Sequence, residues 1–162
     1  MILYHGSNVE VKEPRIINTN RGLDFGAGFY TTTDFEQAKR WAISKTKRMG
    51  SGIPTISVFQ FGESQIEPRL AYKSFKKPNR EWLDYVASNR KGLYTGPQFD
   101  IVSGPVANDR TILIVNDYLS GAYPAETAVL LLETSKLTDQ YAFLTYAAVQ
   151  TLRFKEAMTN VG

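Results

Sequence analysis

Tyr30 and Trp41 lie eleven residues apart in the stretch "GAGFYTTTDFEQAKRW", which covers residues 26–41. Tyr30 belongs to a run of aromatic and β-branched residues typical of a strand, and Trp41 lies about two turns into the helix predicted to follow. Because the chain reverses where that helix begins, the two rings can face each other across a groove. A flat heterocycle between two aromatic faces gains about 0.5–1.5 kcal/mol of stacking energy per pair. The alternative is that Trp41 packs in the core, and the spacing alone favours that interpretation.

Few other side chains offer a nucleophile or a metal ligand. The chain has no cysteine, and His5 is its only histidine. Thiolate zinc sites, disulfides, a cysteine nucleophile and histidine-rich metal sites are therefore excluded, and we expect no bound metal. Phosphate-loop, Gly-x-Gly-x-x-Gly, His-Glu-x-x-His and Gly-x-Ser-x-Gly motifs are absent as well. A lone histidine at the end of a strand is usually structural, so a functional role for His5 has to be inferred from the residues around it.

The secondary-structure pattern mixes strands and helices along the whole chain. Asp34 is the expected N-cap of the helix that carries Trp41, and "GSGIP" at 50–54 is expected to end it. Asn108 or Asp109 is the expected cap of a later helix. Short hairpin-like and edge-like strands favour an α+β domain over a doubly wound parallel sheet. The predicted strands are 2–7, 28–33, 55–61, 71–75, 99–107 and 139–145, and the predicted helices begin near 34, 79, 109, 125 and 146, the last spanning 146–158.

Length and composition predict one ordinary globular domain. The chain has 162 residues, of which 43% are hydrophobic and 22% charged, and a formal net charge of +3. We expect a single domain over 1–162, large enough to bury a core. The mildly basic charge would suit phosphates or nucleic acid without demonstrating either. The beginning of the sequence has no leader pattern and no run is long enough for a membrane helix, so a cytoplasmic protein with no membrane contact is expected.

Taken together, these segments resemble a known superfamily. "HGS" on a first strand, followed by "GFYTT" and a Trp eleven residues after the tyrosine, resembles the His–Tyr branch of the ADP-ribosyltransferases, the diphtheria toxin and poly(ADP-ribose) polymerase type. Most of the chain is also similar to a bacterial family of small domains placed in this superfamily, whose genes often lie beside a small partner gene. The resemblance implies two small packed β-sheets flanked by helices, with NAD as the co-substrate.

The resemblance also implies roles for particular residues. His5 would hydrogen-bond the adenosine-side ribose of NAD, and the backbone of Gly6 would pair with the nicotinamide carboxamide. Tyr30 would stack on nicotinamide, and Trp41 would close the sandwich. Arg21 is the candidate for the pyrophosphate, because a guanidinium matches its oxygens, although a solvated loop charge is an equally good interpretation.

The third motif of the superfamily departs from its usual form in this sequence. Where the superfamily has a glutamate that holds the 2′-hydroxyl of the nicotinamide ribose, the matching residue in "TDQYAF" is Gln140. A carboxamide can accept that hydrogen bond, but it carries no charge and cannot act as a base. Asp139 should point to the opposite face of the strand, and Glu133 should belong to the preceding helix. Gln140 is expected to be a catalytic residue together with Tyr30 and His5.

The function that the resemblance implies is mono-ADP-ribosyl transfer from NAD to a macromolecule, by a toxin that a small antitoxin protein controls. One alternative is a module that binds NAD or ADP-ribose without transfer, which Gln140 makes a real option. Another is NAD hydrolysis, or transfer to nucleic acid as the basic charge allows. A basic run on the first predicted helix could serve nucleic acid but is usually a solvated face; it comprises Lys39, Arg40, Lys45, Lys47 and Arg48.

Overall fold

The computed structural model describes residues 1–17, 22–62, 68–108 and 110–162. These residues form seven strands and five helices in a mixed order, as expected for an α+β protein. Their bounds are β1 Ile2–Ser7, β2 Phe29–Thr31, α1 Phe35–Met49, β3 Thr55–Gln60, β4 Tyr72–Ser74, α2 Arg80–Arg90, β5 Ile101–Pro105, α3 Thr111–Leu119, α4 Ala125–Glu133, β6 Asp139–Phe143, α5 Tyr146–Val149 and β7 Arg153–Thr159.

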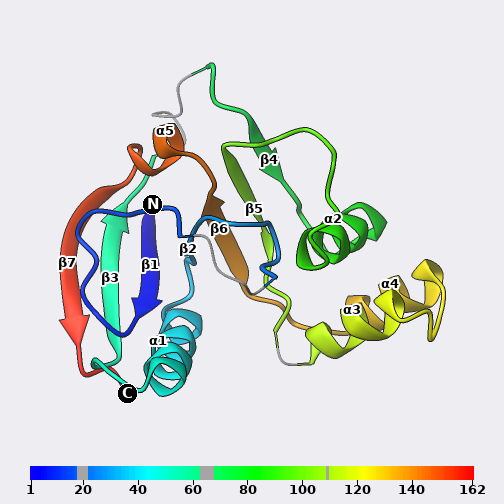
Figure 1. Cartoon of the computed structure of the whole chain (residues 1–162), viewed down its shortest axis with the longest axis horizontal. Coiled ribbons are helices and arrows are strands. Elements are labelled where there is room, and N and C mark those ends of the chain that lie inside the picture. Colours follow the sequence, from blue (N-terminus) through cyan, green and yellow to red (C-terminus); the bar gives the residue numbers. More distant parts are fainter. Residues whose placement is uncertain (18–21, 63–67, 109) are drawn as a thin grey trace.

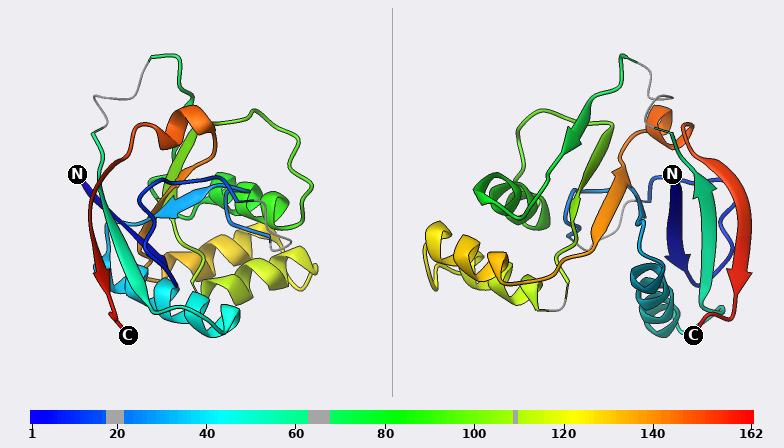
Figure 2. Two further views of the ribbon diagram at one scale, coloured as in Figure 1. Left: turned by 60° about the vertical axis from the view of Figure 1, so that its left-hand side comes forward. Right: turned by 180° about the vertical axis from the view of Figure 1, so that it is seen from behind.

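The strands form two small sheets. One has three strands in the order β1-β3-β7, and the other has four in the order β2-β6-β5-β4, with only β4 and β5 parallel among the described pairs. Helix α1 covers the three-stranded sheet, whereas α2, α3 and α4 lie beside the four-stranded sheet (Figure 1). The two remaining views show the four-stranded sheet between these helices and the three-stranded sheet, at which both chain termini lie (Figure 2).

Three apolar clusters hold these layers together. The first fills the space between the four-stranded sheet and α2–α4 and includes Phe25, Trp82 and Ala142. The second joins the two sheets, since it combines Leu3 and Phe59 of one sheet with Phe29 and Phe143 of the other and with α5. The third packs α1 on the three-stranded sheet through Ala38, Ile56 and Val58. No helix in the described ranges is long and apolar enough to cross a membrane.

The strand-to-helix unit that carries Tyr30 and Trp41 forms as predicted. Asp34 caps α1, because its side chain accepts a hydrogen bond from the Gln37 backbone N–H at 2.7 Å. Gly50 ends the helix in the left-handed conformation at φ 64°, which glycine adopts without steric cost. Asn108 lies two residues before Arg110, the N-cap of the helix that follows β5, and its Oδ1 accepts from the Thr111 N–H at 3.1 Å. The other cap candidate, Asp109, lies outside the described residues.

The prediction of a closing helix over 146–158 is wrong. Only Tyr146–Val149 is helical, and Arg153–Thr159 forms β7, which pairs antiparallel with β3. Phe154 then packs edge-on against Phe59 of β3, with ring centroids 5.8 Å apart. The open edge of β3 supplies a row of backbone partners that the local pattern of the sequence does not reveal, so tertiary pairing overrides helix propensity here.

The two sheets meet at one point along their edges. β1 is an edge strand of the three-stranded sheet and β2 an edge strand of the four-stranded sheet. Tyr4 and Thr32 join them, with the Tyr4 N–H donating to the Thr32 carbonyl at 2.8 Å and the Thr32 N–H donating to the Tyr4 carbonyl at 2.9 Å. His5 and Gly6 follow directly after this bridge on β1, and Tyr30 precedes it on β2. The fold therefore brings three of the predicted site residues to the junction of the sheets.

Candidate functional site

His5 is tied to the backbone of Tyr30. Its Nδ1 lies 2.7 Å from the Tyr30 carbonyl oxygen, and its ring stacks on Phe29 with centroids 4.0 Å apart and an angle of 22°. A carbonyl oxygen can only accept, so Nδ1 carries the proton and Nε2 is the unprotonated acceptor in the neutral ring. Burial lowers the pKa of His5 to about 4, partly opposed by the Tyr30 carbonyl and assisted by the positive charge of Lys45. His5 therefore offers a neutral hydrogen-bond acceptor at physiological pH.

The titration of His5 gives the first testable prediction. Because the folded pKa of about 4 lies below the ordinary value of 6.5, the unfolded chain takes up the proton first as the pH falls. The free energy of unfolding should thus be unaffected by His5 above pH 6.5 and fall by up to about 3 kcal/mol towards pH 4. His5 is the only histidine, so one set of imidazole NMR signals reports its titration. A His5→Gln variant should lack this component of the pH dependence, and a midpoint near 6.5 in the folded protein would contradict the assignment.

Gly6 presents an unpaired stretch of backbone at the edge of β1. Both backbone groups of Tyr4 bond to Thr32, so they point away from β3. Alternate residues of an antiparallel strand direct these groups to the same side, so the N–H and carbonyl of Gly6 also point away from β3. Within the described ranges, no hydrogen bond from outside the β1–β3 pairing reaches the buried backbone of Gly6. A donor and an acceptor are therefore set side by side at this edge.

Trp41 lies on the stripe of α1 that faces the junction. Gln37, Trp41 and Lys45 are four residues apart and so share one side of the helix. Oε1 of Gln37 accepts from the Thr138 hydroxyl at 2.9 Å, next to β6, and the charge of Lys45 acts on His5. Trp41 is partly exposed and belongs to none of the three apolar clusters found in the described chain. The core-packing alternative for Trp41 is not supported, although no ring contact in that part of the chain joins Trp41 to Tyr30.

Tyr30 and Gln140 lie on the same face of the four-stranded sheet. Tyr30 is directly opposite Ala142 in the β2–β6 pairing, and Gln140 is two residues before Ala142 on β6. Residues opposite each other, and residues two apart on one strand, share a face. The Tyr30 hydroxyl donates to the Gly26 carbonyl at 2.6 Å and accepts from the Phe25 N–H at 2.9 Å. Burial raises the pKa of Tyr30 well above its usual value, so this phenol cannot serve as a base.

Gln140 is buried, and its carboxamide is held in one orientation. Nε2 donates to Oδ2 of Asp24 at 2.8 Å and to the Pro105 carbonyl at 3.2 Å. Only the NH₂ end can donate to two oxygens, so Oε1 is the remaining atom. Within the described part of the chain, Oε1 makes no hydrogen bond. The side chain is only 2% exposed, and the two bonds of Nε2 fix the direction of Oε1.

Asp24 was missed by the sequence analysis, and it organises the surroundings of Gln140. Its Oδ1 accepts from Nε of Arg90 at 2.8 Å and lies 2.5 Å from the second guanidinium nitrogen. Its Oδ2 accepts from the Ala107 N–H at 2.9 Å as well as from Gln140. Asp24 is 5% exposed, and a buried carboxylate needs such partners. The only signal in the sequence is a carboxylate inside the apolar, glycine-rich stretch "GLDFGAG".

The other acidic candidates have structural places. Both carboxylate oxygens of Asp139 accept from Thr33, at 3.0 Å from its N–H and 2.7 Å from its hydroxyl, and so hold the turn that leads into α1. Glu133 is the exposed last residue of α4. Both predictions for these residues are confirmed. Arg21, the candidate for the pyrophosphate, lies outside the described residues. Among the described side chains, no three of the His, Cys, Asp or Glu type gather as they would around a metal ion.

Comparison with known proteins gives one match. A family model with the description "Protein of unknown function (DUF3990)" matches residues 1–154, which is almost the whole chain. Neither the curated proteins nor the solved structures contain a match.

Proposed function

The chain belongs to the DUF3990 family, and we propose that it is an NAD-dependent ADP-ribosyltransferase. It would break the bond between nicotinamide and ribose and transfer ADP-ribose to a macromolecule. The observation that carries this proposal is the open edge of β1, where the backbone N–H and carbonyl of Gly6 stand beside the neutral ring of His5. A primary carboxamide such as that of nicotinamide requires one donor and one acceptor in this arrangement. Nε2 of His5 can accept from a ribose hydroxyl at the same time.

The two aromatic residues support the binding of a flat ring near this edge. Trp41 lies on the stripe of α1 that faces the junction, outside the core, which leaves its indole for a ligand. Tyr30 is fixed by the two hydrogen bonds of its hydroxyl, so its ring loses little freedom when a ligand binds. In the proposed complex Tyr30 and Trp41 stack on nicotinamide, and each contact is worth about 0.5–1.5 kcal/mol beyond the burial of area.

Gln140 would act through its oriented oxygen. In the proposed complex Oε1 accepts from the 2′-hydroxyl of the nicotinamide ribose, which favours the positive charge that develops on that ring as nicotinamide leaves. The carbon–nitrogen electron pair goes to nicotinamide, the acceptor forms the new bond to the ribose carbon, and the acceptor proton is released to water. A carboxamide stabilises this charge less than a carboxylate would, and Asp24, which is paired with Arg90, holds the carboxamide in its orientation.

We further propose that the transferase acts in the bacterial cytoplasm as the toxin of a pair with a small antitoxin protein. This rests only on the resemblance of the sequence to the bacterial family of small domains whose genes often lie beside a small partner gene. Binding of a purified neighbour-encoded protein that stops NAD cleavage would support it, and unchanged cleavage in the presence of that protein would count against it.

Release of nicotinamide from NAD is the direct test of the transferase. The purified protein should release nicotinamide, and Gln140→Ala should lower the rate by about 100-fold, as the loss of one preorganised hydrogen bond at the reacting centre does in other enzymes. Gln37→Ala is the matched control, because Gln37 is also buried and hydrogen-bonded but bonds to Arg40 and Thr138. Equal losses in both variants would mean a general effect on the fold. If NAD raises the melting temperature but no nicotinamide is released with any acceptor, the protein is an NAD-binding module instead.

A further inference from the structure

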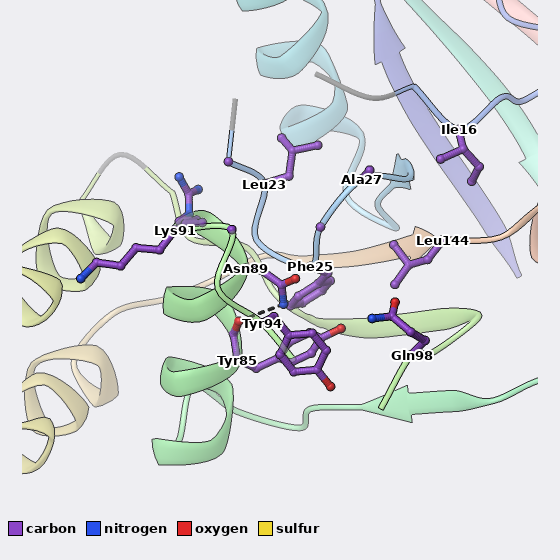
Figure 3. Close-up of a pocket in the computed structure, with 14 residues that line it drawn as sticks. Ile16, Leu23, Phe25, Ala27, Tyr85, Asn89, Lys91, Tyr94, Gln98 and Leu144 are labelled. Carbon is purple, nitrogen blue, oxygen red and sulfur yellow. Dashed lines mark hydrogen bonds between the residues drawn. The ribbon is translucent and has the colours of Figure 1, made fainter. Parts of the chain in front are cut away.

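A pocket lies on the other side of Tyr30 from His5. It has a volume of about 630 Å³ and is lined mainly by the turn 25–27 and by the end of α2 with the segment that follows. Figure 3 shows Phe25, Tyr85 and Tyr94 on its floor, with the amides of Asn89 and Gln98 directed into it. Phe25 and Tyr85 belong to the apolar cluster on the α2 face of the four-stranded sheet, whereas His5 stacks on Phe29 of the inter-sheet cluster. The pocket and the Tyr30 ring therefore lie on the α2 face of the sheet, whereas the His5 ring packs on the inter-sheet cluster.

The charged residues in the described lining of the pocket are Arg90 and Lys91. This lining contains no acidic residue. Arg90 is paired with Asp24, and the ammonium group of Lys91 extends away from the pocket towards the Leu119 carbonyl, 3.4 Å away (Figure 3). In the described lining, therefore, a phosphate or an acidic peptide would find no unpaired cation directed into the pocket. The pocket favours a neutral ligand.

Its polar groups are carboxamides beside fixed aromatic rings. Nδ2 of Asn89 donates to the Tyr85 carbonyl at 2.9 Å, which leaves one N–H and Oδ1 available. Gln98 is exposed and makes no hydrogen bond within the described chain. Tyr94 is held by the bond of its hydroxyl to the Pro97 carbonyl at 2.6 Å and by edge contact with Tyr85, with ring centroids 4.9 Å apart. Carboxamides pair with the edges of nucleobases, and aromatic rings stack on their faces.

We propose that this pocket binds a nucleobase of a single-stranded nucleic acid, the macromolecule that accepts ADP-ribose. This rests on the proposed transferase function. The Tyr30 hydroxyl bonds to Phe25 and Gly26, which line the pocket, so a base there lies next to the ring that would stack on nicotinamide. The reaction is NAD⁺ plus a base N–H giving ADP-ribosyl base, nicotinamide and H⁺. The base nitrogen forms the bond to the ribose carbon, and nicotinamide leaves with the electron pair.

Fluorescence anisotropy with labelled single-stranded DNA and RNA of mixed sequence tests the pocket directly. Gln98→Ala and Tyr94→Ala should each raise the Kd by about tenfold, from the loss of one base-edge contact or one stacking contact. Gln150→Ala and Tyr146→Ala are matched controls, because both residues are exposed and lie outside the pocket lining. Gln98→Trp, which fills the pocket from a residue without a hydrogen bond, repeats the test if Tyr94→Ala is poorly folded.

Several results would overturn this proposal. One is that neither nucleic acid binds, and another is that the pocket variants and the control variants change the Kd equally. A third is that Gln98→Ala weakens NAD binding and leaves oligonucleotide binding unchanged, which would mean that the pocket binds the adenine of NAD. Nicotinamide release in the absence of oligonucleotide separates the two proposals. Release without nucleic-acid binding keeps the transferase and removes this acceptor, whereas pocket-dependent binding without any release keeps the pocket and removes the transferase.

Discussion

Gln140→Glu should lower the free energy of unfolding at pH 8 by about 3 kcal/mol, although the two side chains have the same shape. Nε2 of Gln140 donates to the Asp24 carboxylate and to the Pro105 carbonyl, at 2.8 and 3.2 Å. A carboxylate oxygen in its place would face two acceptors and a second negative charge in a site that is 2% exposed. Either the fold opens locally, or the new carboxyl group takes up a proton.

The pH dependence distinguishes this charge effect from a loss of packing. The like charge and the burial would raise the pKa of the new carboxyl above its ordinary value of about 4.3. The folded state then binds more protons than the unfolded state between these two values, so the stability deficit of the variant relative to the unsubstituted protein shrinks as the pH falls from 8 to 5. Gln140→Met should lose stability equally at both pH values.

Gln37→Glu is the matched control for the same substitution. Oε1 of Gln37 accepts from Arg40 and Thr138, both at 2.9 Å, so a carboxylate there gains a charged partner. We expect the free energy of unfolding, measured in urea, to change by no more than about 0.5 kcal/mol. If both glutamates were tolerated at pH 8, the Asp24–Gln140 contact could not have the geometry described. The contact also gives a physical reason for an amide at this position, since Asp24 already supplies the local carboxylate.

Local signals in the sequence were sufficient to predict the part of the site that carries Tyr30 and Trp41. Tyr30 and Trp41 are close in the chain, and the cap at Asp34 fixes how the strand turns into the helix. The short range of these interactions makes them predictable from residue type and spacing. The same holds for the αL glycine at Gly50. The helix predicted over 146–158 failed where a distant strand edge, that of β3, competed with local propensity.

The part of the site around Gln140 depends on contacts that residue spacing cannot reveal. Asp24 meets Gln140 across 116 residues, and Arg90 reaches Asp24 from the end of α2. No periodicity connects these residues, so a lone Asp in a loop and a lone Gln on a strand look ordinary. The resemblance singled out Gln140 but said nothing of its orientation. Gln140 has this orientation because the buried carboxylate of Asp24 requires hydrogen-bond donors, and Nε2 of Gln140 is one of them.

Gly6→Ala is expected to have an effect of similar size, because of where α1 packs. A Cβ atom on Gly6 would lie 2.0 Å from the Ala38 carbonyl oxygen and 2.8 Å from the Ala42 nitrogen. Both are backbone atoms of α1, so no side chain can rotate away and the helix has to move. We expect a loss of about 3 kcal/mol in the free energy of unfolding, at the upper end for overpacking by one methyl group.

The movement of α1 away from β1 would also change the candidate site. α1 carries Trp41 and Lys45 on the stripe facing His5, so moving the helix off β1 displaces both relative to the Gly6 edge. NAD should then bind more weakly than the loss of stability alone explains, which titration at a temperature where the variant is fully folded can measure. Gly121→Ala provides the comparison. Gly121 has φ 81° and nothing within 4 Å of an added Cβ, so only backbone strain of about 1 kcal/mol is expected, with NAD affinity unchanged. If Gly6→Ala behaved like Gly121→Ala, the close packing of α1 on β1 could not be what fixes the site.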